Sequence, residues 1–315
     1  MTAYRSDTSK HGLSASNTQG LLYSMLALTL SGIGISGALS GNIWIWIAGQ
    51  VILAFAFVEW FVILHECGHR TLFRSRWINQ LMGAVSAFMA LIPYTAWRHV
   101  HARHHVWTGW QDRDITTETL VPRPLARWER WVIDAAWRVW IPLFSVLYRV
   151  QNFWNTRRMA RFLDAVLMRR IRLENIGFLA TYIVLAAWLG PAELFMLCGP
   201  GLLLALAIED ILLLSQHTHM PTQIAGTARV QPLSPRAQQA CTRSLCLPAW
   251  LSRMLMHFDA HELHHMYVRV PGYHLRALGM QTPNEVRWWQ WLCAAKKLSG
   301  KDFLFGSRND TGMHL

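Results

Sequence analysis

Four stretches of the chain are almost continuously apolar and stand apart from the polar sequence around them. An α-helix rises about 1.5 Å per residue, so about 20 apolar residues in a row cross the hydrocarbon core of a bilayer. We therefore expect an all-α integral membrane fold with four transmembrane helices at about residues 21–39, 42–64, 174–190 and 192–214. Ser40-Gly41 joins the first two and Gly190-Pro191 joins the last two. Such short connections link antiparallel neighbours and predict two hairpins.

Two further apolar stretches are shorter or interrupted by charges. Leu81–Ala96 is uncharged, and we expect a short helix that lies in or dips into the membrane interface and ends near Pro93. Trp128–Val150 is punctuated by charged residues, a pattern typical of an amphipathic surface helix. Residues 221–250 are predicted to form a polar connecting loop.

The basic residues avoid the predicted transmembrane helices. Of the 30 Lys and Arg, residues 1–20 hold two, residues 65–173 hold seventeen and residues 215–315 hold eleven, so none lies at a hairpin tip. If both hairpins enter from the same side, every basic residue lies on that side, which the positive-inside rule identifies as cytoplasmic. We expect a bacterial inner-membrane protein with its active site and both termini in the cytoplasm. A soluble bundle does not account for this segregation.

Composition agrees with a membrane protein and narrows the function classes. The sequence is 52% hydrophobic and 15% charged, with 17 Trp, a residue that favours the membrane–water interface. The net charge of +12 suits an anionic membrane leaflet, and no nucleic-acid-binding motif accompanies it. The five Cys include no CxxC pair, which favours reduced thiols. We expect a disordered cytoplasmic tail over residues 1–20, a membrane domain over 21–280 and a cytoplasmic C-terminal tail over 281–315.

Most of the 15 His fall into four clusters with helical spacing. Positions i, i+3 and i+4 share one helix face, so each cluster is expected to direct its imidazoles at one point. The clusters are HECGH (His65, His69), HVHARHH (His101, His104, His105), QHTH (His217, His219) and HELHH (His261, His264, His265). Under the topology above they share one membrane face, on a cytoplasmic helical cap.

This many imidazoles predicts a metal centre. Eight or nine ligands exceed the four of a zinc site and fit two metal ions with five or six ligands each. Imidazole binds Fe, Cu, Zn and Ni, so the residue type leaves the metal open. HECGH and HELHH also match HExxH, the zinc-protease motif in which Glu66 or Glu262 would act as the base. That site leaves most of the histidines unused, and a metal transporter would need its ligands within the membrane spans.

The order of these clusters resembles the integral-membrane fatty acid desaturase and hydroxylase superfamily. HECGHRTLFRSRWINQLMG and WRHVHARHHVWTGWQDRDI are similar to its first two histidine boxes with their flanks, and HELHHMYVRVPGYHLRAL is similar to its third. The resemblance covers roughly residues 45–115 and 200–280.

The resemblance implies a non-haem di-iron centre that uses O₂ and external electrons as co-substrates. Asp112 and Asp114 follow the second box, where they either orient imidazole N–H groups or form a solvated turn. The implied iron ligands are His65, His69, His101, His104, His105, His261, His264, His265 and His217, with His219 as the alternative to His217.

The resemblance also implies oxidation of a lipid at the membrane. The favoured reaction introduces a double bond into a fatty acyl chain carried by CoA, an acyl carrier protein or a phospholipid. Hydroxylation, ketolation and oxidative decarboxylation of a lipid or alkyl substrate are alternatives on the same scaffold. The sequence contains neither a cytochrome b5-like extension nor a CxxC set for an iron–sulfur cluster or rubredoxin site. Electrons are therefore expected from a separate ferredoxin-like or rubredoxin-like protein.

Overall fold

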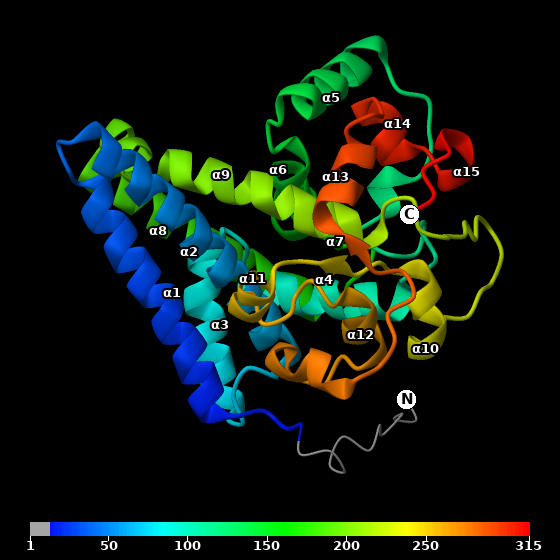
Figure 1. Cartoon of the computed structure of the whole chain (residues 1–315), viewed down its shortest axis with the longest axis horizontal. Coiled ribbons are helices and arrows are strands. Elements are labelled where there is room, and N and C mark those ends of the chain that lie inside the picture. The colour runs from blue at the N-terminus through cyan, green and yellow to red at the C-terminus, as the bar shows by residue number, and fades with distance from the viewer. Residues whose placement is uncertain (1–12) are drawn as a thin grey trace.

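Four long helices form the frame of the molecule in the computed structural model, which describes residues 13–315 (Figure 1). They are α1 (Asn17–Ala38), α2 (Ile43–His69), α8 (Ala165–Leu189) and α9 (Pro191–His217), and each is long and apolar enough to cross a membrane. The four apolar helices expected from the sequence are thus confirmed, although α2 continues to His69 and α8 begins at Ala165. The predicted tail of residues 1–20 lies partly outside the described residues, and α1 already begins at Asn17.

Shorter elements connect and cover the long helices. Between α2 and α8 lie α3 (Arg76–Ala90), α4 (Tyr94–Trp107), η2 (Glu118–Leu120), α5 (Arg127–Val139), α6 (Leu143–Arg149), the π-helical turn η3 (Val150–Trp154) and α7 (Thr156–Met159). After α9 come α10 (Pro235–Gln238), η4 (Gln239–Cys241), β1 (Leu245–Cys246), α11 (Ala249–Met254), α12 (His261–Met266), η5 (Gly272–Leu278), β2 (Val286–Arg287), α13 (Trp288–Ala295), α14 (Gly300–Phe305) and α15 (Arg308–Thr311). The two short strands pair in parallel, with Leu245 opposite Val286.

The most buried of the long helices is α2, which packs against α1, α3 and α9. Glycines let the backbones of α1 and α2 touch, because a Cβ on Gly49 would lie 2.6 Å from the backbone nitrogen of Ala38. Small residues permit this close approach between helices in membranes. The outer faces of α1 and α8 expose large apolar side chains such as Leu28 and Trp188. Those faces are suited to contact lipid chains.

A proline inside α9 is compensated by a side chain of α2. Pro200 has no N–H to donate to the Met196 carbonyl, and an unsatisfied carbonyl is costly within a membrane. Gln50 Nε2 donates to the Met196 carbonyl at 3.1 Å, and Gln50 Oε1 accepts from the Gly201 N–H at 2.8 Å. These bonds fix α9 against α2, and both helices end in histidine clusters.

The stretch Leu81–Ala96 does not form the single short interfacial helix that we expected. α3 ends at Ala90, Leu91 adopts a left-handed conformation with φ of 57°, and α4 begins after Pro93. Pro93 does interrupt the helix, as predicted, but it also precedes a new one. The new helix, α4, carries the second histidine cluster.

The prediction of one amphipathic helix over Trp128–Val150 is also wrong. α5 ends before Trp140, which has φ of 59°, and α6 begins after Pro142. Proline lacks the N–H that a continuing helix needs, so the chain turns at this point. The two helices that result form part of the wall of a cavity described below.

The last two regions are more structured than the sequence indicates. Residues 221–250 contain α10, η4, β1 and the start of α11, rather than only a connecting loop. Residues 281–315 fold into β2 and α13 to α15, and Trp291 and Phe303 are buried in a small core with Leu214 of α9. The C-terminal segment therefore packs beside the end of α9 that carries His217.

Candidate metal centre

Nine of the predicted ligands meet in the structure, and they come from α2, α4, α9 and α12. They form two groups, and within each group the nearest ring nitrogens all lie within 4.8 Å of one another. The first group is His65, His69, His101, His105 and His264. The second group is His104, His217, His261 and His265.

Each three-histidine cluster is divided between the two groups. On α4 the i and i+4 histidines join the first group, and His104 at i+3 joins the second. On α12 the assignment is reversed, so that His264 joins the first group. Positions i+3 and i+4 lie on opposite sides of position i around a helix axis, because a turn contains 3.6 residues. The expectation that each cluster points at one place is therefore wrong for the two three-histidine clusters, whereas His65 and His69 do join the same group.

The ring nitrogens that face into each group approach one another closely. In the first group, His105 Nε2 lies 3.1 Å from His101 Nε2 and 3.0 Å from His264 Nε2. In the second group, His261 Nε2 lies 3.0 Å from His217 Nε2 and 3.0 Å from His265 Nε2. Two facing nitrogens can hydrogen-bond only if one of them is protonated, so the proton positions decide what these contacts mean.

Hydrogen-bond acceptors on the outer side of the groups define the proton positions of four of the nine rings. An Nδ1 that faces an acceptor carries the proton, which leaves the Nε2 of the same neutral ring as a lone pair. Acceptors face four Nδ1 atoms: Glu66 Oε1 at His65 (3.2 Å), Asp114 Oδ2 at His104 (2.6 Å), Gln238 Oε1 at His265 (2.9 Å) and the Cys241 carbonyl at His217 (3.4 Å). The inward nitrogens of these rings present lone pairs to a shared space, an arrangement that a cation stabilises.

Five imidazoles of α4 and α12 are held in their neutral, metal-binding form. Burial lowers the pKa of these five rings well below the usual value, and the neighbouring imidazoles lower it further. These are His101, His105, His261, His264 and His265. Burial alone would raise the pKa of the Asp114 carboxyl, but His104 and the hydrogen bond from Thr116 bring it below the usual value. Asp114 is therefore an anion facing the outer nitrogen of His104.

The structure separates two pairs of candidates that the sequence left open. Asp114 is buried and orients an imidazole, whereas Asp112 accepts backbone N–H groups in the loop after α9. His219 lies outside both groups, because its Nε2 is 3.1 Å from the Phe303 carbonyl. His217 is thus the histidine of the QHTH segment that joins the second group.

The glutamates of the two HExxH matches are engaged elsewhere. Glu66 Oε2 accepts the Gly272 N–H at 2.9 Å while its other oxygen faces the outer side of His65. Glu262 Oε1 accepts the Asn284 N–H at 3.1 Å. Glu262 is also fully buried. Neither arrangement resembles a base beside a single zinc-bound water.

Two residues beside the imidazoles were missed in the sequence. Thr116 Oγ1 lies 3.0 Å from His104 Nδ1 and also donates to Asp114. Thr116 follows Asp114 by two residues, a spacing typical of a turn in which an aspartate side chain accepts a hydrogen bond from the backbone. This spacing could have identified Thr116 from the sequence. Gln238 is 27 residues from His265 within a stretch that reads as a connecting loop, and nothing in the local pattern marks it.

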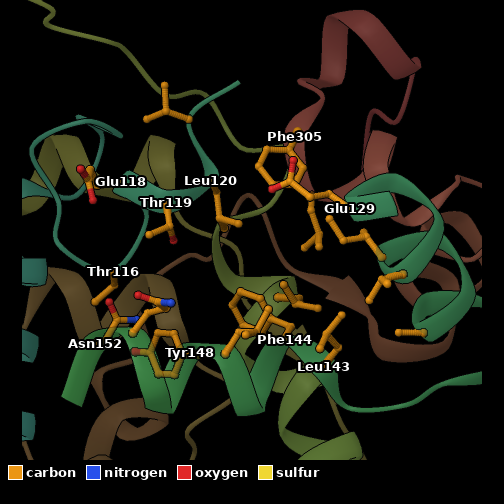
Figure 2. A pocket seen from close by; sticks show the side chains of 18 of the residues that line it. Thr116, Glu118, Thr119, Leu120, Glu129, Leu143, Phe144, Tyr148, Asn152 and Phe305 are labelled. Atoms are coloured by element: carbon orange, nitrogen blue, oxygen red, sulfur yellow. The ribbon is translucent and has the colours of Figure 1, made fainter. Parts of the chain in front are cut away.

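An apolar cavity of about 740 Å³ lies beside the metal centre, and we call it the chamber (Figure 2). Its wall comes from the η2 segment, α5, α6, the end of α9 and α14, and Figure 2 shows Leu143, Phe144 and Phe305 lining it. A smaller cavity of about 50 Å³ is lined by imidazoles of both groups. The two cavities share five lining residues, which are Thr116, Leu120, Phe144, Tyr148 and Leu214.

The arginines that line the chamber are each paired with a carboxylate. Glu118 binds Arg158 at 3.1 Å and Arg161 at 2.9 Å. Arg123 binds Glu129 at 2.7 Å. These pairs neutralise the positive charge around the cavity, so its lining does not provide a free guanidinium group for an anionic ligand.

Comparison with known proteins identifies relatives that match most of the chain. A model of the fatty acid desaturase family matches residues 41–289. The Delta(12)-acyl-lipid-desaturase of Punica granatum is 28% identical over 234 residues, which cover 68% of this chain and 59% of that protein. The sn-1 oleoyl-lipid 12-desaturase of a Picosynechococcus strain is 25% identical over 69% of this chain and 62% of its own length. A shorter match, 38% identical over 72 residues (21% of this chain and 20% of that protein), is to the sn-1 acyl-lipid omega-3 desaturase (ferredoxin) of a Nostoc strain. The chain spans about three fifths of the length of the first two relatives.

Proposed function

The chain belongs to the fatty acid desaturase family, and on this premise we propose that it is an O₂-dependent membrane oxidase with two non-haem iron ions that introduces a double bond into a fatty acyl chain. The observation that carries the proposal is the convergence of nine buried or half-buried imidazoles in two adjacent groups. The first group would bind one ion and the second group the other.

The donor set fits iron in number and type. Ring nitrogens face one another at about 3 Å in both groups. Where two such nitrogens are both lone pairs, they repel unless a cation lies between them. Five and four imidazoles, arranged side by side, exceed what a single tetrahedral zinc ion uses. Bound iron supplies the oxidising chemistry once O₂ and two electrons from outside the chain are available.

The residues of the chain itself hold the ligands and keep water away. Glu66 and Asp114 keep their imidazoles in the tautomer whose Nε2 faces inward. Trp97 stacks on His101 with ring centroids 4.6 Å apart, and Phe258 packs edge-on against His65. This packing limits the rotation of the rings and shields the centre from bulk solvent.

The chamber is the proposed site of the acyl chain. Its wall is mostly apolar, as a hydrocarbon chain requires, and its volume is within the range of about 300–1,000 Å³ that is usual for ligand cavities. The shared residues Phe144, Tyr148 and Leu214 would hold the reacting segment beside the two groups. Because the arginines of the lining are paired, a chain in a neutral ester linkage fits better than a free carboxylate. Two relatives are named for acyl-lipid and oleoyl-lipid substrates.

A separate protein is the proposed source of electrons. One relative is named with ferredoxin as its donor, and we propose an acidic ferredoxin-like or rubredoxin-like partner for this chain. The net charge of +12 would attract such a partner.

The proposed topology is two hairpins, with a helical cap and both termini on the cytoplasmic side of a bacterial inner membrane. Its support is the absence of Lys and Arg from the Gly41 and Gly190 junctions. In a cysteine-free background, a membrane-impermeant thiol reagent added outside should label Gly41→Cys and spare Ala102→Cys on α4. Outside labelling of Ala102→Cys would place the α4 histidines on the opposite face and remove the basis of this topology.

Lipid analysis tests the reaction. Cells that express the chain under air should contain lipids with a new double bond by mass spectrometry, and cells that express His264→Ala should not. A new hydroxyl, keto group or terminal alkene would identify hydroxylation, ketolation or decarboxylation instead. Purified protein that holds one tight zinc ion and no iron under iron-replete conditions would contradict the oxidase proposal.

A further inference from the structure

A glutamine from the region between α9 and α12 reaches into the metal centre. Gln238, the last residue of α10, is 2% exposed, which is unusual for a polar side chain in so short an element. Its Oε1 lies 2.9 Å from His265 Nδ1, and its Nε2 donates to the His105 carbonyl at 2.7 Å. One amide therefore contacts both histidine-bearing helices, α4 and α12.

The orientation of this amide is determined by its surroundings. The Nε2 end faces two backbone carbonyls, those of His105 at 2.7 Å and Leu233 at 3.4 Å, and a carbonyl can only accept. The Oε1 end must then face His265, and it can only accept from that ring. His265 consequently carries its proton on Nδ1, and its Nε2 lone pair faces His261 Nε2 at 3.0 Å.

We propose that Gln238 is a positioning residue of the metal centre, which fixes the tautomer and ring orientation of His265 and ties that ring to the backbone of α4. This inference rests on the proposed di-iron function. His265 belongs to the second group and His105 to the first, so the amide also sets the position of one group relative to the other. Outer partners of metal-bound imidazoles typically change metal affinity by about 10- to 100-fold.

The test measures Co²⁺ binding by the purified full-length protein, because Co²⁺ reports ligand geometry through its visible absorption without any turnover. Gln238→Met removes both hydrogen bonds while it keeps a side chain of similar length. Gln239→Met is the matched control, since Gln239 is the half-buried neighbour and donates to the Gln281 carbonyl, away from the imidazoles. Gln238→Glu retains an acceptor for His265 and loses the donor to the His105 carbonyl.

We expect Gln238→Met to bind one of two Co²⁺ ions about 10- to 100-fold more weakly, with an altered spectrum for that ion. Gln239→Met should match the wild type. Gln238→Glu should keep both ions and shift one set of bands, because a carboxylate makes His265 a stronger donor. A Gln238→Met protein with wild-type affinity and spectrum would overturn the proposal.

Two further outcomes keep the test decisive. If Gln238→Met does not fold, Gln238→Glu decides the question. A folded Gln238→Glu protein that has lost one ion, although it retains the acceptor, overturns the proposal. A folded Gln238→Glu protein that binds two ions with shifted absorption bands supports the proposal. If the wild type itself binds no Co²⁺, the proposed di-iron function fails, and the role of Gln238 fails with it. A failure of the Gln238 role alone is recognised by normal binding in both the wild type and Gln238→Met.

Discussion

The two histidine groups differ in how the protein orients their rings. In the second group, three of the four imidazoles have an acceptor at Nδ1, from Asp114, Gln238 or the Cys241 carbonyl. In the first group, Glu66 faces one of five, and much of the remaining constraint is aromatic packing from Trp97 and Phe258. The second group is thus held by hydrogen bonds and the first largely by shape.

This difference teaches that the two proposed iron sites are chemically distinct. An acceptor at Nδ1 makes an imidazole a stronger electron donor, whereas a stacked aromatic ring holds its direction with little effect on basicity. Imidazoles of both groups line the small cavity that borders the chamber, where the acyl chain would lie. We therefore expect two iron environments that respond separately to substitution.

The largest expected effect comes from the residue of α12 that crosses into the first group. His264→Ala should lower iron content and abolish lipid oxidation, because it removes a proposed ligand that faces His105 at 3.0 Å. Glu262→Gln should keep both ions, and its lipid oxidation should fall by less than about tenfold. A tenfold loss is typical when an outer partner of a metal-bound imidazole is removed, and Glu262 is not such a partner. Iron analysis and lipid mass spectrometry measure both. The opposite result, a silent His264→Ala and an inactive Glu262→Gln, would favour the zinc protease.

The next effect separates the two groups. Asp114→Asn should weaken metal binding by about 10- to 100-fold at the second group alone, because it replaces the anion beside His104 with a neutral amide. In Mössbauer spectra of ⁵⁷Fe-loaded protein, one of two doublets should shift or disappear. Asp112→Asn is the control, because that carboxylate contacts only backbone amides in the described part of the chain and should leave both doublets unchanged. Equal loss of both ions in Asp114→Asn would mean that the groups are not independent.

A smaller effect should appear in the metal-free protein as the pH falls. Burial lowers the pKa of imidazoles in both groups, including His101 and His265, so the unfolded chain binds protons near pH 6.5 before the folded chain does. The stability that these residues contribute is present above about pH 6.5 and is lost as pH falls toward the lower folded-state values. The thermal midpoint in detergent should drop between pH 8 and pH 5, and bound metal should reduce the drop. An unchanged midpoint would show that the rings titrate normally.

Much of the frame could be predicted because it depends on local pattern. The four long helices follow from apolar length, and the ligand candidates follow from histidine spacing. The division of each cluster between two groups could not be predicted, because it depends on how α4 and α12 face each other. The same is true of Gln238, whose role arises from a contact across 27 residues of chain. The break at Pro142 could have been predicted, because proline interrupts a helix. The apolar pattern on both sides of it instead favoured one continuous helix.

The convergence of ring nitrogens has a consequence for the life of the protein in the cell. The two groups join segments from His65 to His265, so bound iron would cross-link residues that lie up to some 200 positions apart in the chain. A newly made chain without iron would carry the repulsion of the inward nitrogens without the attraction that offsets it. Ligands that bind only the folded state raise its population by mass action, and unfolded chains are removed by proteases. We expect iron starvation to shorten the half-life of this chain, so that iron supply controls its abundance as well as its activity.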